Sequence, residues 1–536
     1  MFDKHSVGES IAQRVSALIA ADSGWSQCLW RIGTLGALEE CLSLAKSGAT
    51  LTRNQYVINT ARRVTEKDPA ILGKRRGQIL SSLPKKADSF ALGSSSYFLL
   101  RHEVDNLRSD YYELWDTYLS KIDESEDVED TCIDINSTAS YIAAHLRTCG
   151  FSDKWIAKHC SYYLNHHSEK SSLRELLKVA GDIFKKGSGL YEFLVPLPQV
   201  SFGRLTGAPW LPAEEFSREF EACFPEVDPP THAGGLLFRI EALEKYGAYD
   251  SFVRKFSLAR VRSRIGAGNR ELAFVNSYWV VPGDGCEIQF EFADPFQLTI
   301  SALDSEEGRR LLQPLPSELE AALDLLSNRK MAPSRSSCIT SWAVMETLFA
   351  DPTDFGSMAD IADRAADLLT CMYVTDLFIR IADRHLQAED DDLCIRLCSA
   401  TAGKRFAYIV EHISMGRSIP DGEGQDIVDL QEAKRLVEEE RYLHTIRNEF
   451  SEALRRLYDV RNQIVHAGIL EPYAMDATLL VASKLLIAII DEAIEDSFHS
   501  EEPTALLAAK CRWLLNRVEG GKSLALLGAF KVDMPD

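Results

Sequence analysis

The sequence predicts a mainly α-helical protein, with a C-terminal helical bundle preceded by a mixed α+β region and an N-terminal helical region. Near the N-terminus, apolar residues such as Ile11, Val15 and Leu18 recur at three- and four-residue spacing, which is typical of an amphipathic helix. In the middle of the chain, prolines and glycines cluster, and β-branched and aromatic residues alternate with polar ones, which is typical of strands. Beyond this stretch the helical spacing returns and continues to the end of the chain.

Length and composition exclude several classes of protein. The chain has 536 residues, of which 46% are hydrophobic and 26% charged, and this balance is typical of a folded globular protein with several domains. The net charge of −21 argues against a protein that coats DNA non-specifically. An enzyme that cuts RNA needs positive charge only inside a cleft, so the acidic balance does not exclude one.

Cysteine usage and hydropathy favour a cytoplasmic protein without a membrane partner. The twelve cysteines are scattered and form no C-x-x-C pair, so we expect reduced thiols rather than a disulfide framework. The most apolar run, Leu479 to Ile490, is interrupted by Lys484 and is about half as long as a membrane span requires. We expect this run to be a buried helix.

The patterns divide the chain into four regions. Residues 1–110 and 111–185 are predicted to be helical, residues 186–312 to form the α+β region, and residues 313–536 to form the helical bundle. Four segments in the third region are predicted strands: Tyr191–Val195, Gly235–Ile240, Ser277–Val281 and Glu287–Phe292. The sequence Pro-Gly-Asp-Gly at 282–285 predicts a hairpin turn between the last two.

Helix-start signals mark the boundaries of several predicted helices. In the second region, Ser152 or Asp153 is expected to cap a helix. This helix and the one before it have the spacing of a helix-turn-helix motif. Because no basic residues line a recognition face, we favour two packed helices over a DNA-binding motif. In the last region, helices are expected to begin near residues 317, 337, 357, 391, 429 and 475. The acidic run Glu389–Asp392 is interpreted as a solvated turn or helix N-terminus rather than as a metal site, because adjacent residues rarely converge on one ion. No nucleotide-binding fingerprint is present, and we expect neither metal nor cofactor.

Three arginine–histidine pairs have a spacing that could serve catalysis: Arg380 with His385, Arg405 with His412, and Arg461 with His466. Spacing alone does not distinguish them, because a chain of this composition contains such pairs by chance. The pair Arg380 and His385 is expected to lie on an exposed helix face. Only in the third pair does an asparagine, Asn462, follow the arginine directly.

The segment around this third pair, LYDVRNQIVHAG at 457–468, resembles the motif of the HEPN superfamily of helical ribonucleases, and in particular its ApeA-type branch from bacterial anti-phage defence. The segment Ser341–Phe349 resembles the first core helix of that branch, and Ile361–Ala366 resembles its companion helix. The resemblance covers about 200 residues and implies that residues 313–536 form a HEPN domain.

The chemistry of RNA scission fits these residue types. On a helix, Asn462 and His466 share a face, and the long side chain of Arg461 can swing toward it. Histidine can act as general base or acid near neutral pH, and the arginine fork matches phosphate oxygens. The resemblance implies a metal-independent endonuclease with catalytic Arg461, Asn462 and His466, acting on tRNA or mRNA as a homodimer formed through the HEPN domain. A 2′,3′-cyclic phosphate and a 5′-hydroxyl are the products it implies.

Several alternatives remain open. The resemblance suggests an abortive-infection effector, with the regions before the bundle sensing a phage-derived trigger or restraining the nuclease. The chain could instead be a non-catalytic HEPN scaffold of a defence complex, or the toxin of a toxin–antitoxin pair. Glu346 is a further candidate: it is either a core-edge carboxylate or a supporting site residue paired with Arg461 or Arg364.

Overall fold

The computed structural model describes most of the chain. The described residues are 7–20, 23–47, 51–86, 90–123, 133–165, 172–199, 207–266, 276–283, 285–290, 300–304, 313–327, 334–350, 358–388, 391–419, 425–469, 472–500 and 502–531. Residues Glu389 and Asp390 of the acidic run, and Asp284 of the predicted hairpin turn, lie outside them. The chain forms two compact units: one comprises residues 1–145, 160–174 and 295–536, and the other residues 146–159 and 175–294.

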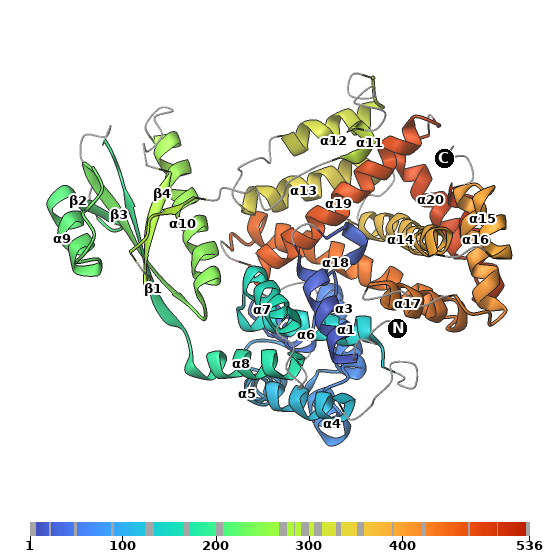
Figure 1. The fold of residues 1–536 in the computed structure, drawn as a ribbon, viewed down its shortest axis with the longest axis horizontal. Helices are drawn as coiled ribbons and strands as arrows, with labels where there is room; N and C mark the ends of the chain where they lie inside the picture. The colour runs from blue at the N-terminus through green and yellow to red at the C-terminus, as the bar shows by residue number, and fades with distance from the viewer. Residues whose placement is uncertain are drawn as a thin grey trace. The chain divides into compact units, whose positions relative to one another are not determined.

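Helices dominate the structure, which confirms the mainly α fold class (Figure 1). The helices in the N-terminal part are α1 (Val7–Ile19), η1 (Trp25–Gln27), α2 (Thr34–Ser47), α3 (Leu51–Lys67), α4 (Gly73–Ser82), α5 (Ser95–Asp123), α6 (Ile135–Cys149), α7 (Asp153–Asn165) and α8 (Ser172–Lys186). The middle part contains β1 (Gly189–Pro196), β2 (Trp210–Pro212), α9 (Ala213–Cys223), β3 (Gly234–Ala242), α10 (Lys245–Gly266), β4 (Ser277–Val281) and β5 (Ile288–Gln289). The C-terminal part contains α11 (Ser301–Asp304), α12 (Ser317–Ser327), α13 (Ser334–Phe349), α14 (Met358–Ala388), α15 (Asp392–Cys398), α16 (Ala402–Ser414), α17 (Gln425–Glu438), α18 (Tyr442–Val465), α19 (Met475–Ser497), α20 (Thr504–Leu515) and η3 (Gly521–Lys531).

The smaller unit contains an antiparallel five-stranded sheet in the order β2-β3-β1-β4-β5. Alternate residues of β1 point to opposite faces, so Phe193 packs with Phe252 of α10 while Leu194 packs with Phe216 of α9. Each face of the sheet is thus covered by one helix (Figure 1). The four predicted strands correspond to β1, β3, β4 and β5, and β4 pairs with β5 as a hairpin. Glu291 and Phe292 of the fourth predicted strand lie outside the described residues.

The central helix of the larger unit is α14, which contacts α13, α16, α18, α19 and α20. The N-terminal region reaches this bundle through Trp30, whose ring centroid lies 5.4 Å from that of Tyr373 on α14 and 5.0 Å from that of Phe450 on α18. Trp30 belongs to the same apolar core as the bundle helices. Residues 1–145 and 295–536 therefore share one core, although almost 150 residues separate them along the chain.

Several predicted helix boundaries agree with the structure. Helices α12 and α19 begin at Ser317 and Met475 as expected, and Asp391 caps α15 by accepting a hydrogen bond from the Cys394 amide at 2.8 Å. Ser152 caps α7, because its hydroxyl accepts from the Trp155 amide at 3.2 Å. The run from Leu479 to Ile490 lies in α19 and contributes buried residues to the core, as predicted. No helix within the described ranges combines the length and the apolar character that crossing a bilayer requires.

The expectation that Arg380 and His385 lie on an exposed helix face is wrong. His385 is 3% exposed, and its Nε2 lies 3.0 Å from the Asp391 carboxylate at the start of α15. Arg380 is half-buried and pairs with Asp429 of α17 at 3.2 Å. Helices α15 and α17 cover this face of α14, and the sequence pattern of α14 alone could not indicate that they would. A second expectation also differs: a helix start was predicted near residue 429, but Asp429 lies inside α17, which begins at Gln425.

The burial of His145 on α6 predicts that the stability of the larger unit depends on pH. It is fully buried between the rings of Tyr111 and Tyr112, at centroid distances of 4.3 and 4.7 Å, and burial lowers its pKa to about 3. In the unfolded chain the ring gains its proton below about pH 6.5. Since the folded state takes up that proton only near pH 3, stability falls as the pH drops between these values.

We therefore expect acidification from pH 7 to pH 5 to cost the wild type about 2 kcal/mol more stability than it costs His145→Phe. Phenylalanine fills the same aromatic site and has no proton to gain. Denaturant unfolding of both proteins at the two pH values measures the difference. Equal losses in the two proteins would show that His145 does not titrate as its burial implies.

Candidate functional site

Helix α18 carries the candidate motif at its C-terminal end. Its apolar residues Leu443, Ile446, Phe450, Leu454 and Leu457 recur every three or four positions and are all buried, which orients the helix against the bundle. The helix ends at Val465, and Gly468 follows with φ of +64°, a conformation that favours glycine. The predicted helix stop at Gly468 is therefore present.

The structure brings the three predicted motif side chains together. Arg461 Nη1 donates a hydrogen bond to Asn462 Oδ1 and lies 3.0 Å from His466 Nε2; the distance to Oδ1 is also 3.0 Å. Because a guanidinium donates only, His466 Nε2 accepts in this contact, as it does in a neutral ring protonated at Nδ1. Arg461 and Asn462 are half-buried and His466 is exposed, so the cluster lies at the surface.

This geometry distinguishes the third arginine–histidine pair from the other two. The Arg380 guanidinium pairs with Asp429, and His385 with Asp391. On α16, Arg405 donates to the Leu397 carbonyl, whereas His412 Nε2 lies 3.2 Å from the Ser418 carbonyl. Only for Arg461 and His466 does a described hydrogen bond join the arginine to its histidine.

The segments that resemble HEPN core helices pack around α18. Ser341–Phe349 lies in α13 and Ile361–Ala366 in α14, and both helices contact α18. The Trp342 ring lies 4.8 Å from that of Tyr458, one turn before the motif. Asp363 of α14 pairs with Arg455 at 2.8 Å and accepts from Ser451 at 2.6 Å. The N-terminal side of the motif is thus held by both apolar and ionic contacts.

Glu346 lies one helical turn from Trp342 on α13 and accepts a hydrogen bond from its indole Nε1 at 2.7 Å. Arg364 donates to the Phe349 carbonyl at 2.6 Å. Neither bond involves Arg461. The described hydrogen bond of Glu346 thus goes to the tryptophan whose ring packs against Tyr458.

Comparisons of the chain with family models, curated proteins and solved structures found no match. Within the described part of the chain, no group of three or more His, Cys, Asp or Glu side chains is arranged to hold a metal ion.

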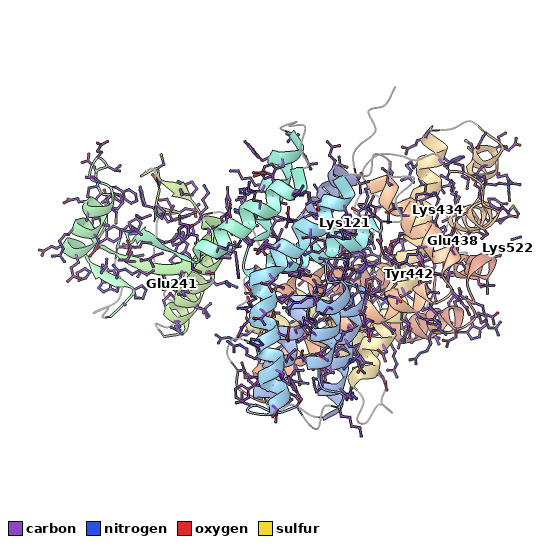
Figure 2. All side chains as sticks on the ribbon, turned by 90° about the horizontal axis from the view of Figure 1, so that it is seen from below. Lys121, Glu241, Lys434, Glu438, Tyr442 and Lys522 are labelled. Atoms are coloured by element: carbon purple, nitrogen blue, oxygen red, sulfur yellow. The ribbon has the colours of Figure 1, made fainter. Side chains whose placement is uncertain are left out.

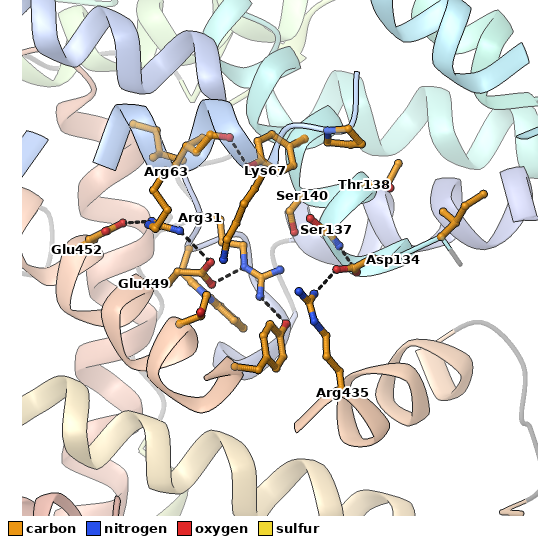
Figure 3. A pocket seen from close by; sticks show the side chains of 18 of the residues that line it. Arg31, Arg63, Lys67, Asp134, Ser137, Thr138, Ser140, Arg435, Glu449 and Glu452 are labelled. Atoms are coloured by element: carbon orange, nitrogen blue, oxygen red, sulfur yellow. Dashed lines mark hydrogen bonds and ion pairs between the residues drawn. The ribbon is translucent and has the colours of Figure 1, made fainter. Parts of the chain in front are cut away.

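A second candidate site is a polar pocket of about 300 Å³ in the larger unit (Figure 3). Its walls come from segments far apart in sequence: the stretch after η1, the end of α3, the start of α6, and helices α17 and α18. The α18 wall consists of Tyr442, Thr445, Glu449, Glu452 and Arg456, which recur every three or four residues along one face. The helix that ends in the motif therefore also forms one side of this pocket.

Ion pairs in and beside the pocket connect the N-terminal region to α18. Arg31 Nε donates to Glu449 at 2.6 Å, Arg63 pairs with both Glu449 and Glu452, and Arg456 pairs with Glu40 at 3.4 Å. Burial alone would raise the pKa of Glu449, but Arg31 and Arg63 outweigh it and hold the pKa below its ordinary value. Glu449 is therefore a buried carboxylate kept ionised by two arginines.

Sequence patterns did not reveal the residues of this pocket. Arg31 and Glu449 are 418 positions apart, and neither belongs to a motif. The one local signal was the concentration of basic residues at the end of α3, where Arg62, Arg63 and Lys67 lie within six positions. The basic residues of α4 have other partners: Arg75 pairs with Glu103 of α5, and Arg76 donates to the carbonyls of Asp68 and Ile71.

Proposed function

We propose that this chain is a metal-independent RNA endonuclease of the HEPN type, with Arg461, Asn462 and His466 as its catalytic residues. The observation that carries the proposal is the hydrogen-bonded cluster of these three side chains at the exposed end of α18. It joins a fixed cation, an amide and an imidazole, which together supply the groups that RNA transesterification needs.

The resting cluster suggests how the reaction proceeds. Arg461 stays hydrogen-bonded to His466 Nε2 until a phosphate of the substrate attracts the guanidinium toward its own oxygens. Nε2 is then free to accept the proton of the 2′-hydroxyl, whose oxygen attacks the adjacent phosphorus. Arg461 stabilises the extra negative charge of the phosphorane, and Asn462 orients the guanidinium. The bond to the 5′-oxygen breaks, and that oxygen takes a proton from a second, protonated His466 supplied by the other copy of a dimer.

A two-fold dimer would place two such clusters across one groove and so provide a base and an acid at the same phosphate. The exposure of Val465, His466 and Ala467 leaves this end of α18 accessible to RNA or to a second copy of the chain. We propose the homodimer on this ground, with tRNA or mRNA as substrate. A cytoplasmic anti-phage effector that a phage-derived trigger activates is the role we propose.

Expression of the wild type and of His466→Ala tests the proposal. We expect the wild type, once triggered or overproduced, to arrest growth and fragment cellular RNA, and His466→Ala at equal abundance to do neither. His412→Ala is the matched control, because it removes a histidine near the end of another helix and should behave as the wild type. If wild type and His466→Ala behave alike, the scaffold alternative replaces the nuclease.

A further inference from the structure

The pocket along α18 is lined by more positive than negative charge. Its lining contains five basic side chains and three acidic ones; the basic residues are Arg31, Arg63, Lys67, Arg435 and Arg456. The acidic residues are Asp134, Glu449 and Glu452. Its volume of about 300 Å³ is at the lower end of the range for small-molecule sites. The lining thus favours a small ligand with negative charge.

The arginines of the pocket are held in place by their partners. Arg435 pairs with Asp134, and its guanidinium lies 4.0 Å from the centroid of the Tyr442 ring. Asp134 also caps α6, since its carboxylate accepts from the Ser137 amide at 2.8 Å. Arg31 also donates to the Tyr442 hydroxyl at 3.4 Å. A guanidinium fixed in this way binds an incoming anion without first losing its own freedom of movement.

Lys67 is the exception among these basic residues. Among the residues that the structure describes, no hydrogen bond or ion pair engages its ammonium group, which extends into the pocket (Figure 3). Lys67 is solvent-exposed at the mouth of the pocket. Partial desolvation lowers its pKa; Glu449 opposes this shift, and the positive charges of Arg63, Arg435 and Arg31 add to it. An anion beside Lys67 would offset the repulsion from these three cations.

Further groups on the wall suit a phosphate. Ser137 lies in the first turn of α6, where the helix dipole favours negative charge; Asp134 already supplies one carboxylate there, and the Ser137 side chain belongs to the same lining. Tyr118, which is half-buried, contributes an aromatic side chain to the same lining. An excess of positive charge and an aromatic side chain in one pocket suit a nucleotide.

We propose that this pocket binds a small phosphorylated molecule of the nucleoside diphosphate class, with its phosphates beside Lys67 and the arginines that line the pocket with it. Because the pocket and the motif share α18, the bound molecule would also act on the motif. That consequence rests on the proposed function, whereas binding itself does not.

Calorimetric titration of the full chain with ADP, and separately with inorganic pyrophosphate, tests the site. We expect both to bind, and Lys67→Ala to weaken both by at least about tenfold, because it removes a charge-assisted contact. Lys67→Arg should restore most of the affinity. Lys121→Ala is the control: Lys121 is an exposed lysine on α5 (Figure 2), and its replacement should leave affinity unchanged.

Adenosine, which lacks phosphate, should bind at least tenfold more weakly than ADP. The proposal is overturned if neither ADP nor pyrophosphate binds, if adenosine binds as tightly as ADP, or if Lys67→Ala binds as the wild type does. Titration of His466→Ala separates this proposal from the nuclease. ADP should bind that variant normally whether or not the chain cleaves RNA.

Discussion

Arg461→Ala and His466→Ala are each expected to lower the rate of RNA cleavage by at least about a hundredfold, while substrate binding changes much less. The histidine supplies proton transfer, and the arginine supplies charge that matters most when the phosphorane forms. Cleavage of a labelled RNA by the purified chain, at saturating and at limiting RNA, separates the two effects.

The contact between the two side chains sharpens this prediction. If Arg461 and His466 act as one unit, the double variant should be hardly slower than either single variant. Arg461→Lys should recover only part of the rate, because lysine keeps the charge but lacks the two-pronged geometry. Thermal unfolding should stay near that of the wild type, since His466 is exposed and Arg461 only half-buried. Independent, multiplicative losses would contradict a shared mechanism.

Glu449→Ala is expected to have the largest effect on stability, a loss of about 3–5 kcal/mol in the larger unit. The substitution leaves the Arg31 guanidinium, whose side chain is 15% exposed, without its closest carboxylate partner, at 2.6 Å, and also removes a partner of Arg63. A buried charge that loses its partner costs far more than the intact pair contributes. Denaturant unfolding measures the loss.

Two comparison variants identify the cause of that loss. Glu438→Ala removes an exposed carboxylate at the end of α17 (Figure 2) and should cost less than about 0.5 kcal/mol. The double replacement of Arg31 by methionine and Glu449 by leucine removes both charges and should recover much of the stability. If the double variant is no more stable than Glu449→Ala, the loss of the closest partner of Arg31 is not the reason.

Local patterns predicted the local structure well. The strands around Phe193 and Tyr278 were predicted because β-branched and aromatic side chains, which pack well on the pleated surface of a sheet, are concentrated in them. A cap of α7 at Ser152 or Asp153 and a helix start near Asp391 were predicted because a helix start depends on a few adjacent residues; the structure shows Ser152 and Asp391 as the caps. Glycine at 468 ends α18 for an equally local reason.

Long-range packing was beyond these patterns. His385 carries no local sign that α15 will cover it, so its burial was missed. The pocket depends on Arg31 and Arg63 meeting a helix some 400 residues later, and such pairings depend on the whole fold rather than on any window of sequence. For the motif, spacing alone gave three equal candidates, and the hydrogen bond between Arg461 and His466 now separates one of them from the others.

The chemical nature of the RNA ends tests the central claim most directly. RNA from cells after brief induction, and RNA treated with purified protein in the presence of a chelator, should acquire new 2′,3′-cyclic phosphate and 5′-hydroxyl ends. These ends should be absent with His466→Ala and present with His412→Ala. New ends carrying a 5′-phosphate, or the same cyclic-phosphate ends with His466→Ala, would contradict scission by the cluster of Arg461, Asn462 and His466.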